Sequence, residues 1–218
     1  MKTVHGITLG LALTAAAFTT STTTAFAGSK AHAHMGHVSK SWGDTPEKVG
    51  LLTIAVKEAE IALFHANAAA KNLENLKWMQ THARHVLHAV DASQEAKGPG
   101  KGYGVLKGAK GAAFHINVAA KQSDASDDVK THAVHVAASA QNTVDRALRI
   151  VKVAKQIIAT KSVKTAATLT KRMQGIAIEL QNGRDVNGDG KITWHKGEGG
   201  LKAATKHMGI MYKLEGMS

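Results

Sequence analysis

A stretch of 23 residues occurs twice in this chain, fifty residues apart. Residues 64–86 read FHANAAAKNLENLKWMQTHARHV, and residues 114–136 read FHINVAAKQSDASDDVKTHAVHV. Eleven of the 23 positions are identical without a gap, and three of these are histidines. Because the ends of the stretch are kept while its middle has diverged, we interpret the histidines as the reason for the repeat.

Apolar residues around the repeat recur at spacings of three and four, which is typical of amphipathic helices. Leu52, Val56, Ala59 and Leu63 follow this pattern, and no alternating strand pattern is seen. The sequence therefore predicts an all-α fold, with Ser123 and Ser162 as helix N-caps. The helices are expected over 46–72, 74–92, 104–122, 124–160, 162–182 and 197–213.

Each copy of the repeat predicts one helical hairpin, and two hairpins predict a four-helix bundle over residues 46–160. The glycine-rich run KGPGKGYG, residues 97–104, is the linker between the copies. Residues 161–218 are expected to add C-terminal helices that flank a calcium-type loop over 185–198.

The N-terminal residues have the pattern of an export signal. Lys2 is followed by an apolar run, and Ala25, Phe26 and Ala27 form a small-residue cleavage site before Gly28. We expect a signal peptide over 1–27, a flexible His-rich leader over 28–45, and a periplasmic protein with no stable membrane insertion after cleavage.

The composition of the chain excludes some kinds of cross-link and metal site and argues against one class of partner. The chain has no cysteine, so neither disulfides nor thiolate metal sites can form. Its formal net charge is +12, but the lysines are spread along the chain and aromatic residues make up only 4%. This pattern indicates a solvated surface and argues against nucleic-acid binding.

The spacing of the repeated histidines predicts metal sites. His65 and His82 are 17 residues apart, as are His115 and His132. The midpoint of each pair falls at the predicted hairpin turn, so the two members should lie at the same height on facing helices, whose axes are about 8–10 Å apart. A further histidine lies three residues on, on the same helical face. The candidate ligands are His65, His82 and His85 in one hairpin and His115, His132 and His135 in the other.

Three imidazoles with an open fourth position suit Zn²⁺, and imidazole also suits Cu²⁺ and Ni²⁺. We expect one or two ions per chain, bound either in two separate sites or in one paired site. The alternative is that these histidines are ordinary polar residues on helix surfaces.

Other histidines and methionines have weaker patterns. His32, His34 and His37 are expected to be auxiliary metal ligands in the leader or to have no role. His88 is expected to be solvated. Met208 and Met211 have the helical spacing of core residues, and the alternative is that they bind Cu⁺ together with His207.

Residues 185–196, DVNGDGKITWHK, match most of an EF-hand calcium loop. Asp185, Asn187 and Asp189 occupy positions one, three and five, and Lys191 supplies a backbone carbonyl at seven. Position twelve is Lys196 instead of the usual glutamate, and Glu198 is the expected substitute. A turn rich in Asn, Asp and Gly is the alternative interpretation.

The runs AEIALFHANAAAK, THARHVLHAVD and THAVHVAASA resemble the small metal-binding protein family, which are His-rich helical proteins exported to the bacterial periplasm. The likeness covers roughly residues 50–140. It implies a helical bundle that binds divalent metals, copper among them. This chain has fewer histidines than that pattern and adds the calcium-type loop.

These observations favour a periplasmic protein that stores, buffers or delivers copper, zinc or nickel, with calcium as a further ligand. A metal-dependent enzyme, a non-covalent haem protein for electron transfer and a pH-sensing structural protein remain alternatives. Homodimerisation through the symmetric repeat also remains open.

Overall fold

A computed structural model describes Met1 and residues 28–217. The expected signal peptide lies, apart from Met1, outside the described residues. Seven α-helices and no strand occur in the described part, which confirms the all-α prediction. The helices are α1 (Lys30–Ser39), α2 (Leu51–Ala70), α3 (Leu76–Val90), α4 (Val105–Ala120), α5 (Asp127–Ala159), α6 (Val163–Asn182) and α7 (Leu201–Leu214), and Pro46–Lys48 form a short 3₁₀ turn.

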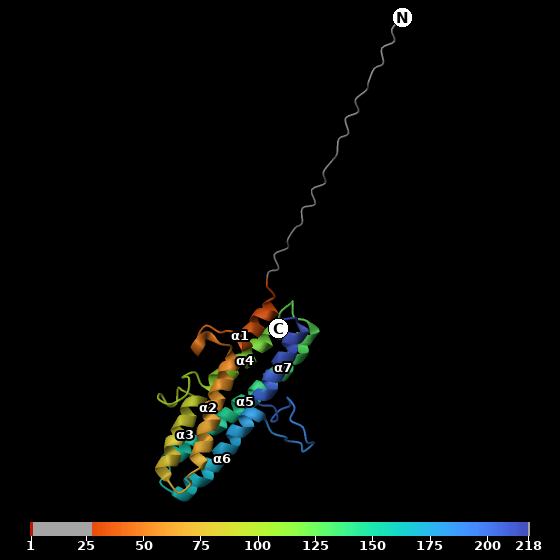
Figure 1. Cartoon of the computed structure of the whole chain (residues 1–218). Coiled ribbons are helices and arrows are strands. Elements are labelled where there is room, and N and C mark those ends of the chain that lie inside the picture. The colour runs from red at the N-terminus through yellow and green to blue at the C-terminus, as the bar shows by residue number, and fades with distance from the viewer. Residues whose placement is uncertain (2–27, 218) are drawn as a thin grey trace.

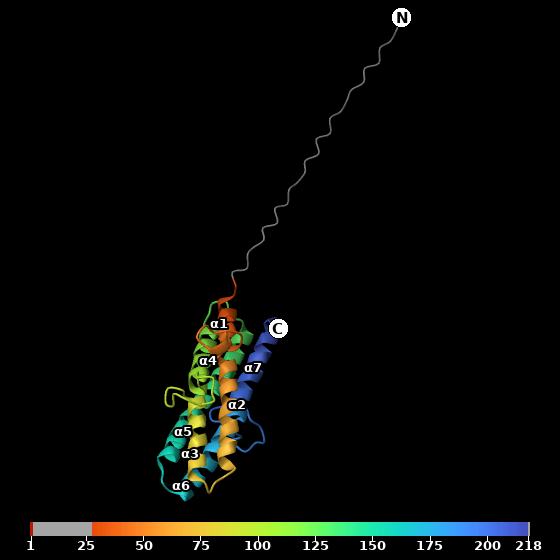
Figure 2. The same ribbon diagram turned by 60° about the vertical axis from the view of Figure 1, so that its left-hand side comes forward.

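The long helix α5 extends along the whole body of the protein, and the shorter helices lie along it (Figures 1 and 2). Helices α1, α4 and α7 lie towards one end, whereas α3 and α6 lie towards the other. Helix α4 packs on α1, α2 and α5, while α2 also packs on α3 and α6. None of these described helices is long and apolar enough to cross a membrane.

A single hydrophobic core includes residues from all seven helices. Many of its members are alanines, which let neighbouring helices approach closely. The repeat supplies matching core positions: Ala83 and Val86 in α3 correspond to Ala133 and Val136 in α5, and all four have no exposed surface. The histidines lie beside these positions, so the repeat places them at the edge of the core.

Residues 30–39 form helix α1, so the prediction of a flexible leader over 28–45 is wrong for this segment. Ala31, Met35 and Val38 recur at spacings of four and three and are completely buried. Ser29 caps the helix by accepting a hydrogen bond from the backbone N–H of His32. An apolar stripe that short gives only a weak periodicity signal. The helix is stabilised by its packing on α4 and α2.

One of the two predicted helix N-caps is confirmed, and the other is wrong. Ser162 accepts a hydrogen bond from the backbone N–H of Thr165 and caps α6 as expected. Helix α5 begins later than predicted, and its cap is Ser126 rather than Ser123, with the backbone N–H of Val129 donating to the Ser126 hydroxyl. Two aspartates follow the cap, and their charge is favourable at a helix N-terminus.

The glycine-rich linker folds back over α2 and α3. Glu58 of α2 is completely buried, and its carboxylate accepts hydrogen bonds from the backbone N–H groups of Lys101, Tyr103 and Gly104. The same segment covers His88, which is only 6% exposed, so the expectation of a solvated His88 is wrong. A Cβ atom at Gly100 would lie 2.9 Å from the His88 ring, which explains why glycine is needed there.

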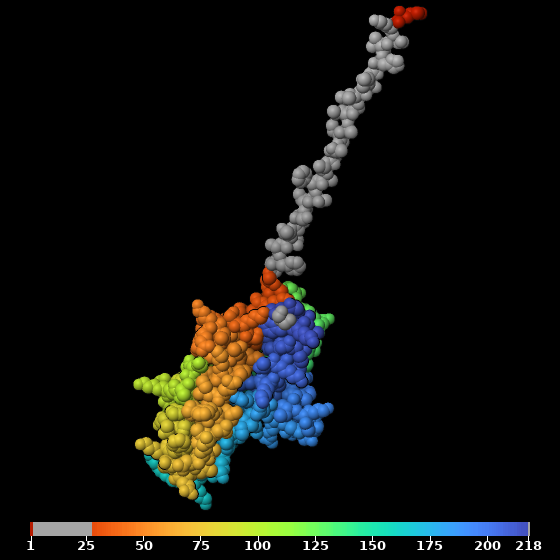
Figure 3. Space-filling view, in the orientation of Figure 1, coloured from red at the N-terminus to blue at the C-terminus, as the bar shows by residue number. Residues whose placement is uncertain are grey.

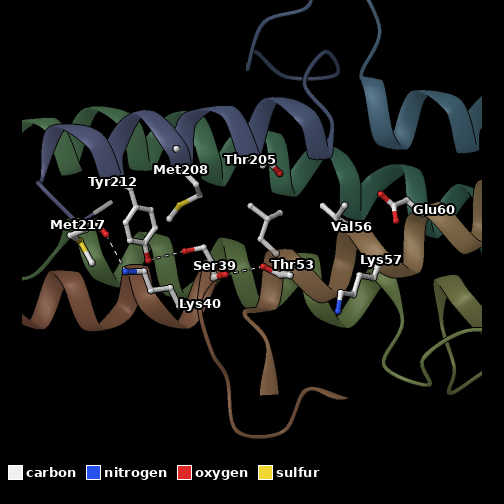
Figure 4. A pocket seen from close by; sticks show the side chains of 12 residues that line it. Ser39, Lys40, Thr53, Val56, Lys57, Glu60, Thr205, Met208, Tyr212 and Met217 are labelled. Carbon is white, nitrogen blue, oxygen red and sulfur yellow. Dashed lines mark hydrogen bonds between the residues drawn. The ribbon is translucent and has the colours of Figure 1, made fainter. Parts of the chain in front are cut away.

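On one face of the molecule, the N-terminal helices adjoin α7 (Figure 3). A groove of about 590 Å³ lies between α1–α2 and α7 (Figure 4), and Leu52, Val56 and Met208 line it. The Ser39 hydroxyl donates a hydrogen bond to the Tyr212 hydroxyl across it, at 2.8 Å. No histidine lines this groove.

Candidate metal centres

Nine histidines in the described residues form three groups that could hold metal ions. In each group, three imidazole nitrogens lie within 4.8 Å of one another. We name the groups triad A (His34, His37 and His115), triad B (His65, His82 and His85) and triad C (His132, His135 and His207).

Triad B has the arrangement predicted from the first copy of the repeat. His65 of α2 faces His82 of α3, with 3.0 Å between their Nδ1 atoms. The Nδ1 atom of His85 lies 3.4 Å from that of His65. All three side chains are half-buried between the two helices of one hairpin.

The second copy of the repeat does not form the predicted triad. His115 turns instead towards α1, where its Nδ1 atom lies 3.0 Å from that of His34 and 3.4 Å from that of His37. Its side chain is 8% exposed, which makes it the most enclosed histidine of triad A. His34 and His37, two of the three expected auxiliary residues of the leader, are therefore part of a triad.

His132 and His135 also lie in a different triad from the predicted one. Their Nδ1 atoms lie 3.2 Å and 3.3 Å from the Nδ1 atom of His207 on α7. Met208 and Met211 belong to the core as expected. The six repeated histidines thus form neither the two separate sites nor the one paired site that the repeat left open, because they are distributed over three groups.

The predicted triad does not form because an equal distance from the hairpin turn determines only how far along the antiparallel helices two residues lie. It does not determine the direction in which their side chains leave those helices. His115 and His132 point to different neighbours, α1 and α7. The sequence of one hairpin holds no information about these outer helices.

One short motif supplies two ligands to every triad. His-x-x-His-Val occurs at residues 34–38, 82–86 and 132–136. The residue after the first histidine and the closing valine are completely buried in all three copies. The two histidines, one turn apart on the same face, are thus held at the core edge, and one histidine from another helix completes the set. The copy at residues 34–38 is a signal in the sequence that could have identified α1 as a ligand-bearing helix.

The nitrogen spacing fits a shared ion. Two nitrogens that each lie about 2.0–2.1 Å from one Zn²⁺, at a tetrahedral angle, are separated by about 3.3–3.4 Å. The Nδ1 separations measured from the single histidine of each triad run from 3.0 to 3.4 Å. Each triad can therefore supply three imidazole ligands to one ion without a large rearrangement.

The surroundings favour the neutral imidazoles that metal binding requires. Burial, together with repulsion from His85 and His82, lowers the pKa of His65 to about 4. Burial, together with repulsion from His135, His132 and Lys206, lowers the pKa of His207 to about 4. Burial is also the main reason why the pKa is lowered for His37, His82, His85, His115 and His135.

We expect the metal-free protein to lose stability as the pH falls from about 6.5 towards about 4. Below pH 6.5 the unfolded chain binds protons at its histidines, while His65 and His207 stay neutral in the folded chain down to about pH 4. The unfolded state is therefore favoured progressively over this window. Thermal melts with a chelator, from pH 7.5 to 4, measure the effect.

The control for these melts is a variant that carries His65→Gln and His207→Gln. Its thermal midpoint should fall less steeply than that of the parent between pH 6.5 and 4, because two of the groups with lowered pKa values are absent. Identical slopes in the two proteins would show that these histidines do not drive the change.

The remaining candidate in α1, His32, lies outside the triads. Its Nε2 atom is 2.7 Å from a carboxylate oxygen of Glu215, so it pairs the first helix with the C-terminal segment. His32 is thus paired with a carboxylate and is not grouped with other histidines, as its predicted auxiliary metal role would require.

The calcium-type loop is organised by its own side chains. The Asp185 carboxylate accepts the backbone N–H groups of Gly188 and Gly190, and Asp189 accepts that of Lys191. Glu198 is buried and accepts the backbone N–H of Thr193. The acidic side chains of the loop are not among the groups spaced for an ion in the described residues. Calcium binding by Asp185, Asn187, Asp189, Lys191 and Glu198 stays a prediction.

No protein family, curated protein or solved structure gives a significant match to this chain. The likeness to the small metal-binding protein family therefore stays a prediction, and the triads are the observation from which a function can be proposed.

Proposed function

We propose that this chain is an exported, periplasmic protein that binds up to three transition-metal ions, copper, zinc or nickel, for storage, buffering or delivery. The observation that carries the proposal is the recurrence of one ligand geometry at three places. Three different helix pairs, α1–α4, α2–α3 and α5–α7, each bring three Nδ1 atoms together.

The ligand chemistry supports this class of ion. Each triad offers three neutral nitrogen donors, which suit zinc, copper and nickel better than calcium or magnesium. The lowered pKa of His65 and His207 keeps these donors free of protons at neutral pH. The predicted signal peptide supports the periplasmic location.

Binding is favoured over catalysis by the position of Glu58. This residue is the acidic group nearest His65 along α2 on the inward face, and both of its carboxylate oxygens accept backbone N–H groups of residues 101–104. It is therefore engaged in holding the linker rather than free to act as a general base beside triad B.

Haem binding is disfavoured by distance. Two axial imidazoles must leave room for a macrocycle between them, but the Nδ1 atoms of His65 and His82 are only 3.0 Å apart. The third histidine of each triad would also have no function in a haem site.

We expect the purified, metal-free protein to take up three equivalents of Cu⁺ or Zn²⁺ per chain, one at each triad. Equilibrium dialysis followed by elemental analysis measures the ratio, and a visible spectrum distinguishes Cu²⁺ from colourless ions. Retention of less than one equivalent of copper, zinc and nickel alike would contradict the proposed function.

A further inference from the structure

The chain contains three tryptophans, and each one lies against a different triad. In triad A, the Trp42 ring lies 4.6 Å from the His115 ring and 4.9 Å from the His37 ring, centroid to centroid. In triad B, Trp78 lies 4.4 Å from His82. In triad C, Trp194 stacks on His135 at 4.4 Å, with 25° between the ring planes.

The tryptophans come from three unrelated places in the chain. Trp78 lies one turn before His82 on α3, but the equivalent position in the second copy is Asp128. Triad C instead receives Trp194 from the loop between α6 and α7, and triad A receives Trp42 from the segment after α1. Duplication of the repeat therefore does not explain why every triad has a tryptophan.

Hydrogen bonds hold these tryptophans in place. The Trp78 indole N–H donates to the Ala68 carbonyl at 2.8 Å, across the hairpin. The backbone N–H of Trp42 donates to the Val49 carbonyl.

The loop that carries Trp194 is fastened to α5 by two residues of that helix. Arg146 donates to the carbonyls of residues 197–199. The Asn142 side-chain amide donates to the carbonyl of His195 and accepts the backbone N–H of Gly197, both at 2.8 Å. The indole is thus positioned by contacts that do not involve the triad.

We propose that Trp42, Trp78 and Trp194 strengthen metal binding at the triads, and more for Zn²⁺ than for Cu⁺. The inference rests on the proposed function, because it concerns the same three sites. An imidazole bound to a metal ion carries positive charge, which an adjacent indole ring stabilises. A divalent ion polarises its ligands more than a monovalent ion does, so the contribution of the indole should be larger for Zn²⁺.

The test compares Trp78→Leu and Trp78→Phe with the parent. Trp78 is 40% exposed, so neither change removes a core side chain, and Ile178→Ala is a matched control because Ile178 is 42% exposed on another helix. Cu⁺ affinity is measured anaerobically by competition with a chromogenic Cu⁺ chelator, and Zn²⁺ affinity by competition with a zinc indicator. Circular dichroism checks the fold of each variant.

In Trp78→Leu, one equivalent of the three should lose about tenfold in Zn²⁺ affinity and less in Cu⁺ affinity, while the phenylalanine variant keeps most of its affinity for both ions. The Ile178→Ala control should match the parent. If all variants bind three equivalents with the affinities of the parent, the proposed role of the tryptophans is wrong and the triads still stand. If the parent binds no copper or zinc, the proposed function itself fails. The emission of the parent's own tryptophans gives a second readout, and emission that does not change on loading with Cu⁺ also contradicts the proposal.

Discussion

Replacing His65, His115 and His207 together by alanine is expected to abolish tight binding of transition-metal ions. Each of these residues is the single histidine that faces a His-x-x-His pair, and its Nδ1 atom lies 3.0–3.4 Å from both partners. Without it, only two imidazoles of one helix remain. Loss of an outer-shell partner typically costs 10–100-fold in affinity, so loss of a ligand should cost more than about 100-fold at each site. Competition titrations with Cu⁺ and Zn²⁺ measure the loss.

The controls use the same kind of residue. Each single variant should lose one equivalent out of three, which tests whether the triads act independently. A variant with His32→Ala and His195→Ala removes two histidines outside the triads and should keep all three equivalents. Parent-like binding in the triple variant, or loss of binding in this control, would show that other residues are the ligands.

The second large effect is expected for Glu58→Ala, which should destabilise the fold by about 3–4 kcal/mol. A buried N–H group that loses its acceptor costs about 1–3 kcal/mol. Glu58 accepts three such groups from the linker, and two of these bonds are fully buried. Urea unfolding followed by circular dichroism measures the change.

Two variants define the cause of this loss. Glu58→Gln keeps one acceptor oxygen and should cost less than the alanine change. Glu60→Ala, two residues away on the exposed side of α2, should shift the unfolding free energy by less than about 0.5 kcal/mol. Equal losses in Glu58→Ala and Glu60→Ala would indicate an effect on the helix rather than on the linker.

The sequence predicted the helices well because long apolar periodicities determine them. The bounds expected for α3 to α6 differ from those observed by at most three residues. Helix α1 was missed because its apolar stripe consists of three residues only. Its stability depends on contacts with α4 and α2, which a local pattern does not contain.

The candidate site was predicted in part for a similar reason. All six repeated histidines lie in triads, and the grouping of His65 with His82 was correct because a hairpin brings sequence neighbours together. His207 has no counterpart in the repeat, and its role follows only from the packing of α7 on α5. The tryptophans were missed as well, since two of them reach their triads from loops.

The pairing of distant segments by the triads has a consequence for the mechanics of a chain without cysteine. An ion held by triad A would tie together positions 81 residues apart, and one held by triad C positions 75 residues apart, whereas triad B spans 17. Cross-links that close longer loops restrict the unfolded chain more, by about 1–2 kcal/mol over this range in the chain-entropy description. Ions bound at triads A and C would therefore act as reversible cross-links. Their release would loosen the two ends of the chain, while the α2–α3 hairpin stays closed.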